Sequence, residues 1–175
     1  LSVLASFAWK NFETSWDTKF FTYALNSFSL AASAAIITVV LGVILSYTKR
    51  LKPSRKARTL VGISSLGYAI PGAVLAIGVI IPFAAFDNLI DGWMREYFNI
   101  STGLILSGTS FAIIFAYSVR FLAVASGSVE SSLSKVTPNM DMAARSLGHT
   151  QLQTLFKIHL PIIKRGALTG MLVVF

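Results

Sequence analysis

The sequence contains no cysteine, and only 13% of its 175 residues are charged. Without cysteine the chain can form no disulfide and no thiolate metal site. It also lacks the G-x-x-x-x-G-K-[ST] loop that binds nucleotide phosphates, so the chain itself is not expected to be an ATPase. No Ser-His-Asp or paired-carboxylate arrangement is present. We therefore expect no enzymatic activity, no cofactor and no metal site, and we interpret His149 and His159 as solvated surface residues.

Long segments of the chain lack charge altogether. No Asp, Glu, Lys, Arg or His occurs in residues 20–48, 59–86 or 98–119. A helix needs about 20 apolar residues to cross roughly 30 Å of hydrocarbon, and 54% of the residues are hydrophobic. These observations predict an all-α membrane protein, a polytopic helical bundle. We expect spans at about 20–48, 59–86 and 100–120, and a truncated span over 166–175.

The excess of basic residues indicates the orientation in the membrane. The net charge is +8, and Lys49–Arg58 carries six Lys and Arg residues between the first two expected spans. Loops rich in Lys and Arg remain cytoplasmic, so this loop and the segment 126–165 should be inside and 87–99 outside. Neither aromatic interleaving nor a nucleic-acid motif accompanies the basic cluster, so we expect membrane lipid nearby and no nucleic acid. Residues 1–19 are interpreted as the end of a preceding span and a periplasmic connection, in a fragment of a longer subunit.

Several residues within the expected spans have a structural interpretation. Pro71-Gly72 and Pro82 predict a packing kink, with a bend that lines a translocation path as the alternative. Arg120 ends the third expected span, where its side chain can extend to the interface. Gly166 and Gly170 form a G-x-x-x-G pattern that favours close packing of helices.

The polar segment 126–165 contains signals for two short helices. Thr137-Pro138 is typical of a helix start, and Gly148 is placed to end that helix in a left-handed conformation. Asp141 and Arg145 are four residues apart and can form an ion pair on this helix. A second helix should start at Thr150, because Thr150 and Gln153 have the spacing of a capping box.

The same segment carries an extended motif. Ala143-Ala144 is followed after three residues by Gly148, and after nine more by Ile158-His159-Leu160-Pro161. This spacing resembles the signature of the membrane subunits of binding-protein-dependent ABC importers, Glu-Ala-Ala, three residues, Gly, nine residues, Ile-x-Leu-Pro. Met142 stands where that family usually has Glu. The resemblance implies a type I ABC importer permease domain over residues 20–175, multi-pass in the bacterial inner membrane.

What the resemblance implies for this segment is a cytoplasmic coupling helix that docks into a cleft on an ATP-hydrolysing subunit. The implied coupling residues are Asp141, Met142, Ala143, Ala144, Gly148, Ile158, Leu160 and Pro161. Asp141 can replace the missing Glu only if the cleft tolerates a shift of about 100° around the helix. The alternative is an amphipathic loop that only covers the bundle.

The transported solute is a separate question. Residues 117–124, 136–148 and 166–175 are most similar to the iron(III) permeases, in which two homologous halves share one polypeptide, and this segment resembles the C-terminal half. The resemblance therefore implies the other permease half and a periplasmic substrate-binding protein as partners. Polyamine, thiamine and sulfate permeases share much of the pattern. A further set of residues offers hard oxygen donors for Fe(III), although we expect these side chains to be solvated in an outer loop: Asp87, Asp91, Glu96 and Tyr97.

Two other functional classes remain as alternatives. The charge-free segments contain no acidic residue or histidine, the groups that proton-coupled carriers use as relays, which argues against a self-powered carrier. A carrier driven by another ion gradient would show uptake without ATP. A membrane scaffold without a transported solute would have no ATPase partner.

Overall fold

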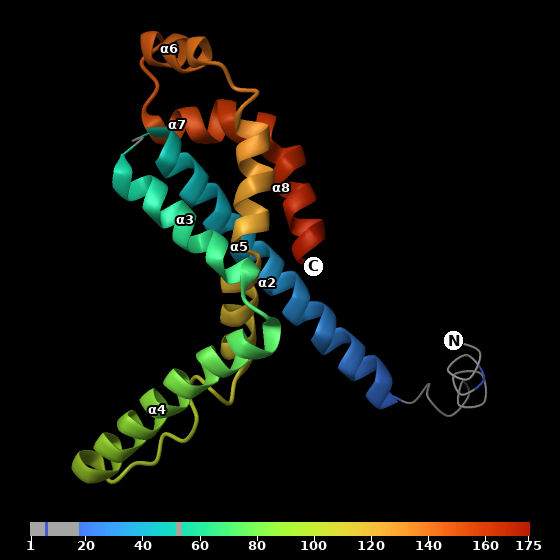
Figure 1. Cartoon of the computed structure of the whole chain (residues 1–175), viewed down its shortest axis with the longest axis vertical. Coiled ribbons are helices and arrows are strands. Elements are labelled where there is room, and N and C mark those ends of the chain that lie inside the picture. Colours follow the sequence, from blue (N-terminus) through green and yellow to red (C-terminus); the bar gives the residue numbers. More distant parts are fainter. Residues whose placement is uncertain (1–5, 7–17, 52–53) are drawn as a thin grey trace.

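The computed structural model describes residue 6 and residues 18–51 and 54–175, and within them the chain is helical and has no strand. The predicted lead-in over residues 1–19 lies almost entirely outside this part. Figure 1 shows the arrangement of the elements. The elements are α2 (Thr18–Leu51), α3 (Arg55–Ala69), α4 (Gly72–Phe98), α5 (Ser110–Leu133), α6 (Pro138–Ser146), α7 (Gln151–Thr154), the π-helical segment η1 (Leu155–His159) and α8 (Leu160–Val174).

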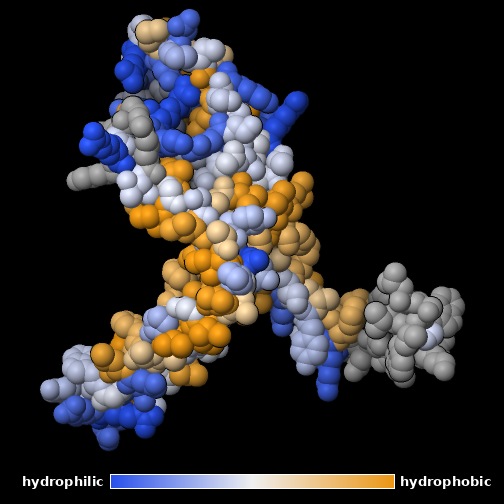
Figure 2. Space-filling view, viewed as in Figure 1, coloured by the Kyte–Doolittle hydropathy of each residue, from blue (hydrophilic) through white to orange (hydrophobic). Residues whose placement is uncertain are grey.

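Three of these helices are long and apolar enough to cross a membrane: Lys19–Leu51, Gly72–Phe98 and Ser110–Leu133. Figure 2 shows hydrophobic residues gathered around the middle of the molecule, with hydrophilic residues at the end that carries α6 and at the tip of α4. This distribution suits a helical bundle that spans a bilayer, with both polar ends in water. The prediction of an all-α membrane protein is confirmed.

The predicted second span, 59–86, is divided between two helices. α3 ends at Ala69, and α4 begins after Pro71, whose backbone is extended. Proline lacks the N–H that a continuous helix would need at this point, whereas Pro82 remains inside α4. Gly67 allows α3 to pack closely on α5, because a Cβ there would overlap the carbonyl of Val119.

The boundaries of the third span also differ from the prediction. The expected outer loop, 87–99, is helical and belongs to α4, which ends where Asn99 adopts a left-handed conformation with φ 53°. The chain then returns without a helix until Thr109, whose hydroxyl accepts a hydrogen bond from the N–H of Phe111 and caps α5. Carboxylates on α4 satisfy the backbone of this returning segment, so it needs no helical hydrogen bonds. As a result, Arg120 lies near the middle of α5 and not at its end.

The core forms where α2, α5 and α8 pack together. Ala35, Val39, Ala125 and Val174 form one buried cluster, and Val129, Leu133 and Ile163 form a second. The G-x-x-x-G pattern lies in this packing, as expected: a Cβ on Gly166 would overlap Ser132, and Gly170 lies against Ser128 and Ala125. Residues 160–165, which the sequence placed in the polar segment, already belong to α8.

Candidate functional site

α6 forms one end of the molecule, beyond the ends of α2 and α5 (Figure 1). It begins at Pro138, after Thr137 with an extended backbone, as the sequence predicts, although the Thr137 side chain makes no capping hydrogen bond. Pro138 suits the first helical position because its missing N–H would be unpaired there in any case. The helix is thus set in place by backbone geometry.

The turn after α6 has the geometry of a Schellman motif. Gly148 has φ 77°, its N–H donates to the Arg145 carbonyl at 2.9 Å, and the N–H of His149 donates to the Ala144 carbonyl at 3.0 Å. Two carbonyls at the end of α6 are thereby satisfied, and the left-handed residue turns the chain sharply. The predicted role of Gly148 in ending the helix is confirmed.

The next helix starts directly after this turn. Thr150 and Gln153 form the predicted capping box, in which each side chain accepts from the backbone N–H of the other residue. The helix then passes through the π-helical turn η1, where the N–H of Leu160 donates to the Leu155 carbonyl. Such π-helical insertions are frequent at functional sites. The turn places His159 on the buried side of the segment.

Asp141 connects α6 to two other elements. Its Oδ2 accepts from Nη2 and Nε of Arg50, at 2.8 and 3.2 Å, and its Oδ1 lies 2.7 Å from Nε2 of His159. An ionised carboxylate can only accept, so His159 donates through Nε2. The predicted Asp141–Arg145 pair is not among the ion pairs of the described residues, because Asp141 faces the bundle and binds Arg50 instead.

Arg50 also holds the chain between α5 and α6. Its Nη1 donates to the Leu133 carbonyl at 3.0 Å and its Nη2 to the Val136 carbonyl at 2.8 Å. These carbonyls lie at the end of α5 and just after it, where helical partners are lacking. One guanidinium thus binds α2 to the end of α5, to the connecting turn and to α6. We call Arg50, Asp141 and His159 the anchor.

The structure corrects the interpretation of His159 as a solvated residue. It is only 1% exposed, and its ring packs edge-on against Tyr47, with centroids 5.5 Å apart. Its Nδ1 is buried without a hydrogen-bond partner among the described residues. His149, in contrast, is half-buried beside a cavity of about 50 Å³ next to the anchor.

Two further contacts join α2 to this region. The Tyr47 hydroxyl donates to the Gln151 carbonyl at 2.7 Å, at the start of α7. Lys49 Nζ lies 2.9 Å from Glu130 Oε1 in an ion pair between α2 and α5. The first two residues of the basic Lys49–Arg58 segment therefore lie in α2, where Lys49 binds α5 and Arg50 binds the end of α5 and the segment after it. The two basic regions lie at the same end of the molecule, as the positive-inside argument requires.

Burial and hydrogen bonding have opposite effects on the pKa of Asp141. Burial acts to raise the pKa of Asp141, but the hydrogen bonds and charges of Arg50 and His159 outweigh it and hold the pKa below its usual value. Asp141 therefore stays ionised at neutral pH, which keeps the anchor intact.

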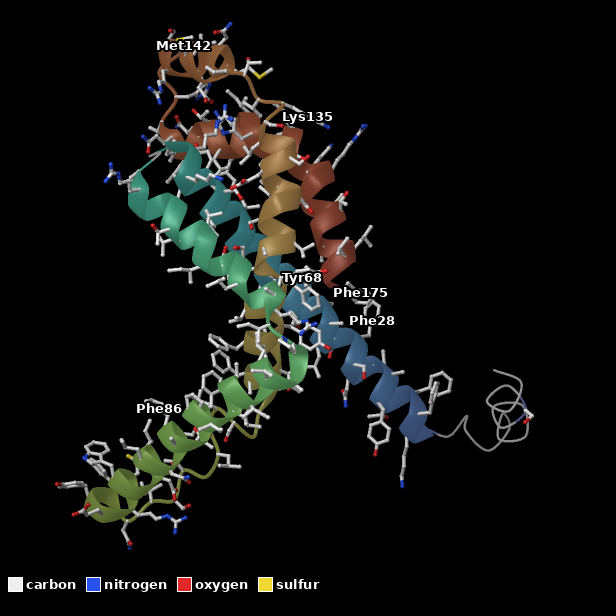
Figure 3. All side chains as sticks on the ribbon, viewed as in Figure 1. Phe28, Tyr68, Phe86, Lys135, Met142 and Phe175 are labelled. Atoms are coloured by element: carbon white, nitrogen blue, oxygen red, sulfur yellow. The ribbon has the colours of Figure 1, made fainter. Side chains whose placement is uncertain are left out.

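The predicted coupling residues fall into an outward and an inward set. Met142 is 57% exposed, and Leu147, which the prediction omitted, is 77% exposed; Ala143 is also exposed. Figure 3 shows Met142 on α6 at the end of the molecule. Ala144 is buried, and Asp141 is directed into the anchor. Asp141 therefore does not offer a free carboxylate in place of the missing Glu.

The residues at the end of the motif belong to the packing of the bundle. Ile158 is half-buried, and Leu160 packs against the cluster of Val129, Leu133 and Ile163. Pro161 is exposed in the first turn of α8. Ile158 and Leu160 therefore set the course of the chain from η1 into α8, and of the three only Pro161 is open to a partner.

The acidic residues of α4 are engaged with the returning segment. Asp87 is buried and accepts from the N–H groups of Leu106 and Ser107 at 2.9 and 2.8 Å. Asp91 accepts from the N–H of Thr102 and pairs with Arg95. Within residues 18–51 and 54–175, no three His, Asp or Glu side chains are grouped to hold a metal ion. The expectation that these side chains are solvated in an outer loop is therefore wrong for Asp87, whose carboxylate is buried against the backbone of the returning segment.

Comparison with known proteins agrees with this geometry. The family described as binding-protein-dependent transport system inner membrane component matches residues 38–175. The chain belongs to this family. Members of the family are transport components and not enzymes, and together with the three membrane-length helices membership places the chain in the inner membrane of a bacterium. No solved structure matches the chain.

Relatives within the family differ in the solute that their names state. The spermidine/putrescine transport system permease protein PotC homolog of Mycoplasma genitalium is 26% identical over 91% of this chain and 51% of its own length. The ferric transport system permease protein FbpB of Actinobacillus pleuropneumoniae is 24% identical over 86% of this chain and 20% of its own length. The chain thus spans about half, or less, of the length of these relatives.

The family signature directs attention to the outward residues of α6, but not to the anchor. Arg50 is 91 positions from Asp141 in the sequence, and it stood among other basic residues with no feature to distinguish it. His159 occupies the variable position of the Ile-x-Leu-Pro motif. The sequence gave one local indication of the anchor: Asp141 and His159 are only 18 positions apart, within one polar segment.

Proposed function

We propose that this chain is part of the translocation pathway of an ATP-driven importer and that α6 transmits the movement of an ATPase subunit to the bundle. The observation that carries the proposal is the combination of exposed apolar residues on α6 with side-chain contacts that tie this helix to the bundle. Met142, Ala143 and Leu147 form that surface. The anchor binds the same helix to α2, the end of α5 and η1.

The arrangement suits a lever because force on α6 reaches several helices at once. Ala143 leaves little bulk, so the wall of a cleft can approach the backbone of α6 closely. A displacement of α6 moves Asp141, and through Arg50 it moves the end of α2. Two elements of the bundle would then rearrange together, as alternating access requires.

Substitution and cross-linking of the outward surface test this role. In a full-length subunit that carries no other cysteine, Met142→Cys gives a defined thiol for cross-linking to the ATPase subunit. Thr169→Cys, exposed on α8, is the control and should not cross-link. Ala143→Trp should abolish ATP-dependent uptake while membrane insertion stays normal, and Ala143→Ser should remain active. Normal uptake by Ala143→Trp, with the ATPase subunit co-purified in unchanged yield, would contradict the proposal.

For the solute we propose iron(III), delivered by a periplasmic substrate-binding protein to a pathway shared with the other permease half. Similarity to the ferric permease supports this assignment. A polyamine is the second candidate, because the PotC homolog is covered over a larger share of its length. Reconstituted full-length subunit, ATPase and candidate binding proteins should show ATP-dependent uptake of ferric iron. Uptake of spermidine, putrescine, thiamine or sulfate in its place would overturn the assignment of iron(III), but not the assignment of the chain to an ATP-driven importer.

A further inference from the structure

Arg120 is a cation inside a membrane-length helix. It lies near the middle of α5, about 15 Å from the start of that helix at 1.5 Å per residue. α5 is long enough to cross a hydrocarbon layer of roughly 30 Å, and Arg120 lies well inside this candidate span, away from both of its ends. Charged side chains at this depth are costly, and they face a protein interior or a water-filled cavity, where they mark solute pathways.

The described residues provide no carboxylate for this arginine. The ion pairs among them are Lys49–Glu130, Arg50–Asp141, Arg95–Asp91 and His159–Asp141. Arg120 has one long hydrogen bond, from Nη1 to the Ile70 carbonyl at 3.5 Å, and its guanidinium lies 5.8 Å from the Phe121 ring centroid. A guanidinium has five N–H donors, so most of its capacity is left for another acceptor.

The guanidinium borders a cavity where α3 gives way to α4. The cavity has a volume of about 280 Å³, and Gly72, Leu75, Ala116 and Tyr117 line it together with Arg120. Gly72 makes room for the arginine, since a Cβ at that position would lie 2.7 Å from Nη1. The first turn of α4 starts here without a side-chain cap, so its free N–H groups add positive potential.

We propose that Arg120 and this cavity bind an anionic group of the transported solute, namely a carboxylate, phosphate or sulfate oxygen. The group is either a free oxyanion or a ligand carried on a metal ion, as in an anionic ferric complex. This inference rests on the proposed transport function and narrows its solute class. A polyamine does not fit, because its ammonium groups would face an unpaired guanidinium and the positive end of a helix.

The charge of the cavity can be measured without transport. In the full-length, assembled protein carrying no other cysteine, Ala116→Cys places a single thiol in the cavity. We expect a negatively charged methanethiosulfonate to modify it faster than a positively charged one of similar size. Arg120→Gln should reduce this rate ratio about tenfold or more. The control is Ala31→Cys, in a second cavity of about 200 Å³ that is lined by uncharged residues and shares only Tyr117 with the first. Its rate ratio should respond much less to Arg120→Gln.

Uptake by the reconstituted transporter tests recognition of the solute. Anionic ferric citrate, sulfate and spermidine are compared for wild type, Arg120→Gln, Arg120→Lys and Gly72→Ala. Loss of one charge-assisted hydrogen bond should lower uptake of the anionic solute about tenfold or more in Arg120→Gln. Arg120→Lys should recover part of it, and Gly72→Ala, which displaces the guanidinium, should be impaired. Arg165→Gln, at an exposed arginine of α8, should transport normally.

The outcomes separate this inference from the proposed function. Ferric citrate uptake without sulfate uptake assigns the oxygen to a ligand on the metal ion, and sulfate uptake assigns it to a free oxyanion. If Arg120→Gln does not change the ratio of modification rates at Ala116→Cys, the guanidinium is neutralised by a carboxylate from elsewhere in the protein. That result would overturn the inference. Spermidine uptake unaffected by Arg120→Gln would overturn it too. Cross-linking of Met142→Cys to the ATPase subunit would still support the proposed role of α6, whether or not the inference about Arg120 is overturned.

Discussion

Arg50 at the end of α2 and Asp141 in α6 are 91 positions apart in the sequence and form an ion pair with an Nη2–Oδ2 distance of 2.8 Å. The same guanidinium binds the carbonyls of Leu133 and Val136. The pair is therefore the point at which the exposed helix α6 is joined to the membrane-spanning part of the chain. Its side chains are 20% and 26% exposed, so water screens the interaction only in part.

Removal of the Arg50 guanidinium should weaken this connection strongly. Arg50→Met leaves Oδ2 of Asp141 and the Val136 carbonyl without this donor, while His159 still binds Oδ1 of Asp141 and the Val136 N–H still binds the Leu133 carbonyl. We therefore expect a loss of about 1–3 kcal/mol in the free energy of unfolding. ATP-dependent uptake should fall as well. Arg50→Lys restores the charge but not the forked geometry, so its effect should be intermediate. Thermal unfolding of the purified complex measures the stability.

Lys49→Met is the matched control for Arg50. The Lys49–Glu130 pair is more exposed, at 37% and 34%, and pairs of this kind contribute about 0–1 kcal/mol. Equal losses from Lys49→Met and Arg50→Met would show that Arg50 has no special role in holding α6.

The lowered pKa of Asp141 predicts how stability changes with pH. A carboxyl whose folded pKa is below its unfolded value stabilises the fold above the unfolded value of about 3.9, and this contribution is lost as pH falls through the folded pKa. The contribution of Asp141 should therefore be complete above about pH 5 and decrease below about pH 4. Asp141→Asn should be less stable at pH 7 and should lack this acidic decrease. Melting temperatures of both proteins against pH provide the measurement.

Gly148 should resist substitution because of its backbone conformation. With φ 77°, a residue with a Cβ costs about 1–2 kcal/mol here, although no atom lies within 4 Å of such a Cβ. Gly148→Val should therefore misdirect α6 and reduce coupling, measured as uptake per ATP hydrolysed. Gly92, where a Cβ also has open space and φ is not positive, is the control. Equal coupling in Gly148→Val and Gly92→Val would contradict the prediction.

Gly166 should be sensitive for a different reason, the closeness of α8 to α5. A Cβ there would overlap Ser132 and lie 2.7 Å from the Ser128 carbonyl. Gly166→Ala should separate the two helices and lower the melting temperature of the complex. Gly78→Ala, in open space on α4, should be neutral or slightly stabilising because alanine favours a helix. A neutral Gly166→Ala would mean that the helices adjust without cost.

The local signals in the sequence were sufficient for the polar segment. Pro138 at the first helical position, Gly148 after the last turn, and the capping box of Thr150 and Gln153 are all found as predicted. Each of these signals acts on backbone groups within a few residues. The amides and carbonyls at the ends of a helix lack helical partners in any tertiary context, so local residues are enough to predict how they are capped. The bend expected at Pro71-Gly72 is also found, as a break between α3 and α4. The limits of the other apolar helices were less accurate, because hydropathy does not show that α4 continues to Phe98 or that α5 begins only at Ser110.

The sequence by itself determined that this chain is an all-helical membrane protein, because uncharged stretches of this length have no other stable arrangement in a bilayer. It also determined the family, through a motif whose spacing can be read directly. Only the tertiary structure decided that Asp141 binds Arg50 and not Arg145, that His159 is buried, and that Arg120 lies beside a cavity. These features depend on which helices pack together, and contacts between residues far apart in the sequence leave no periodic pattern in it.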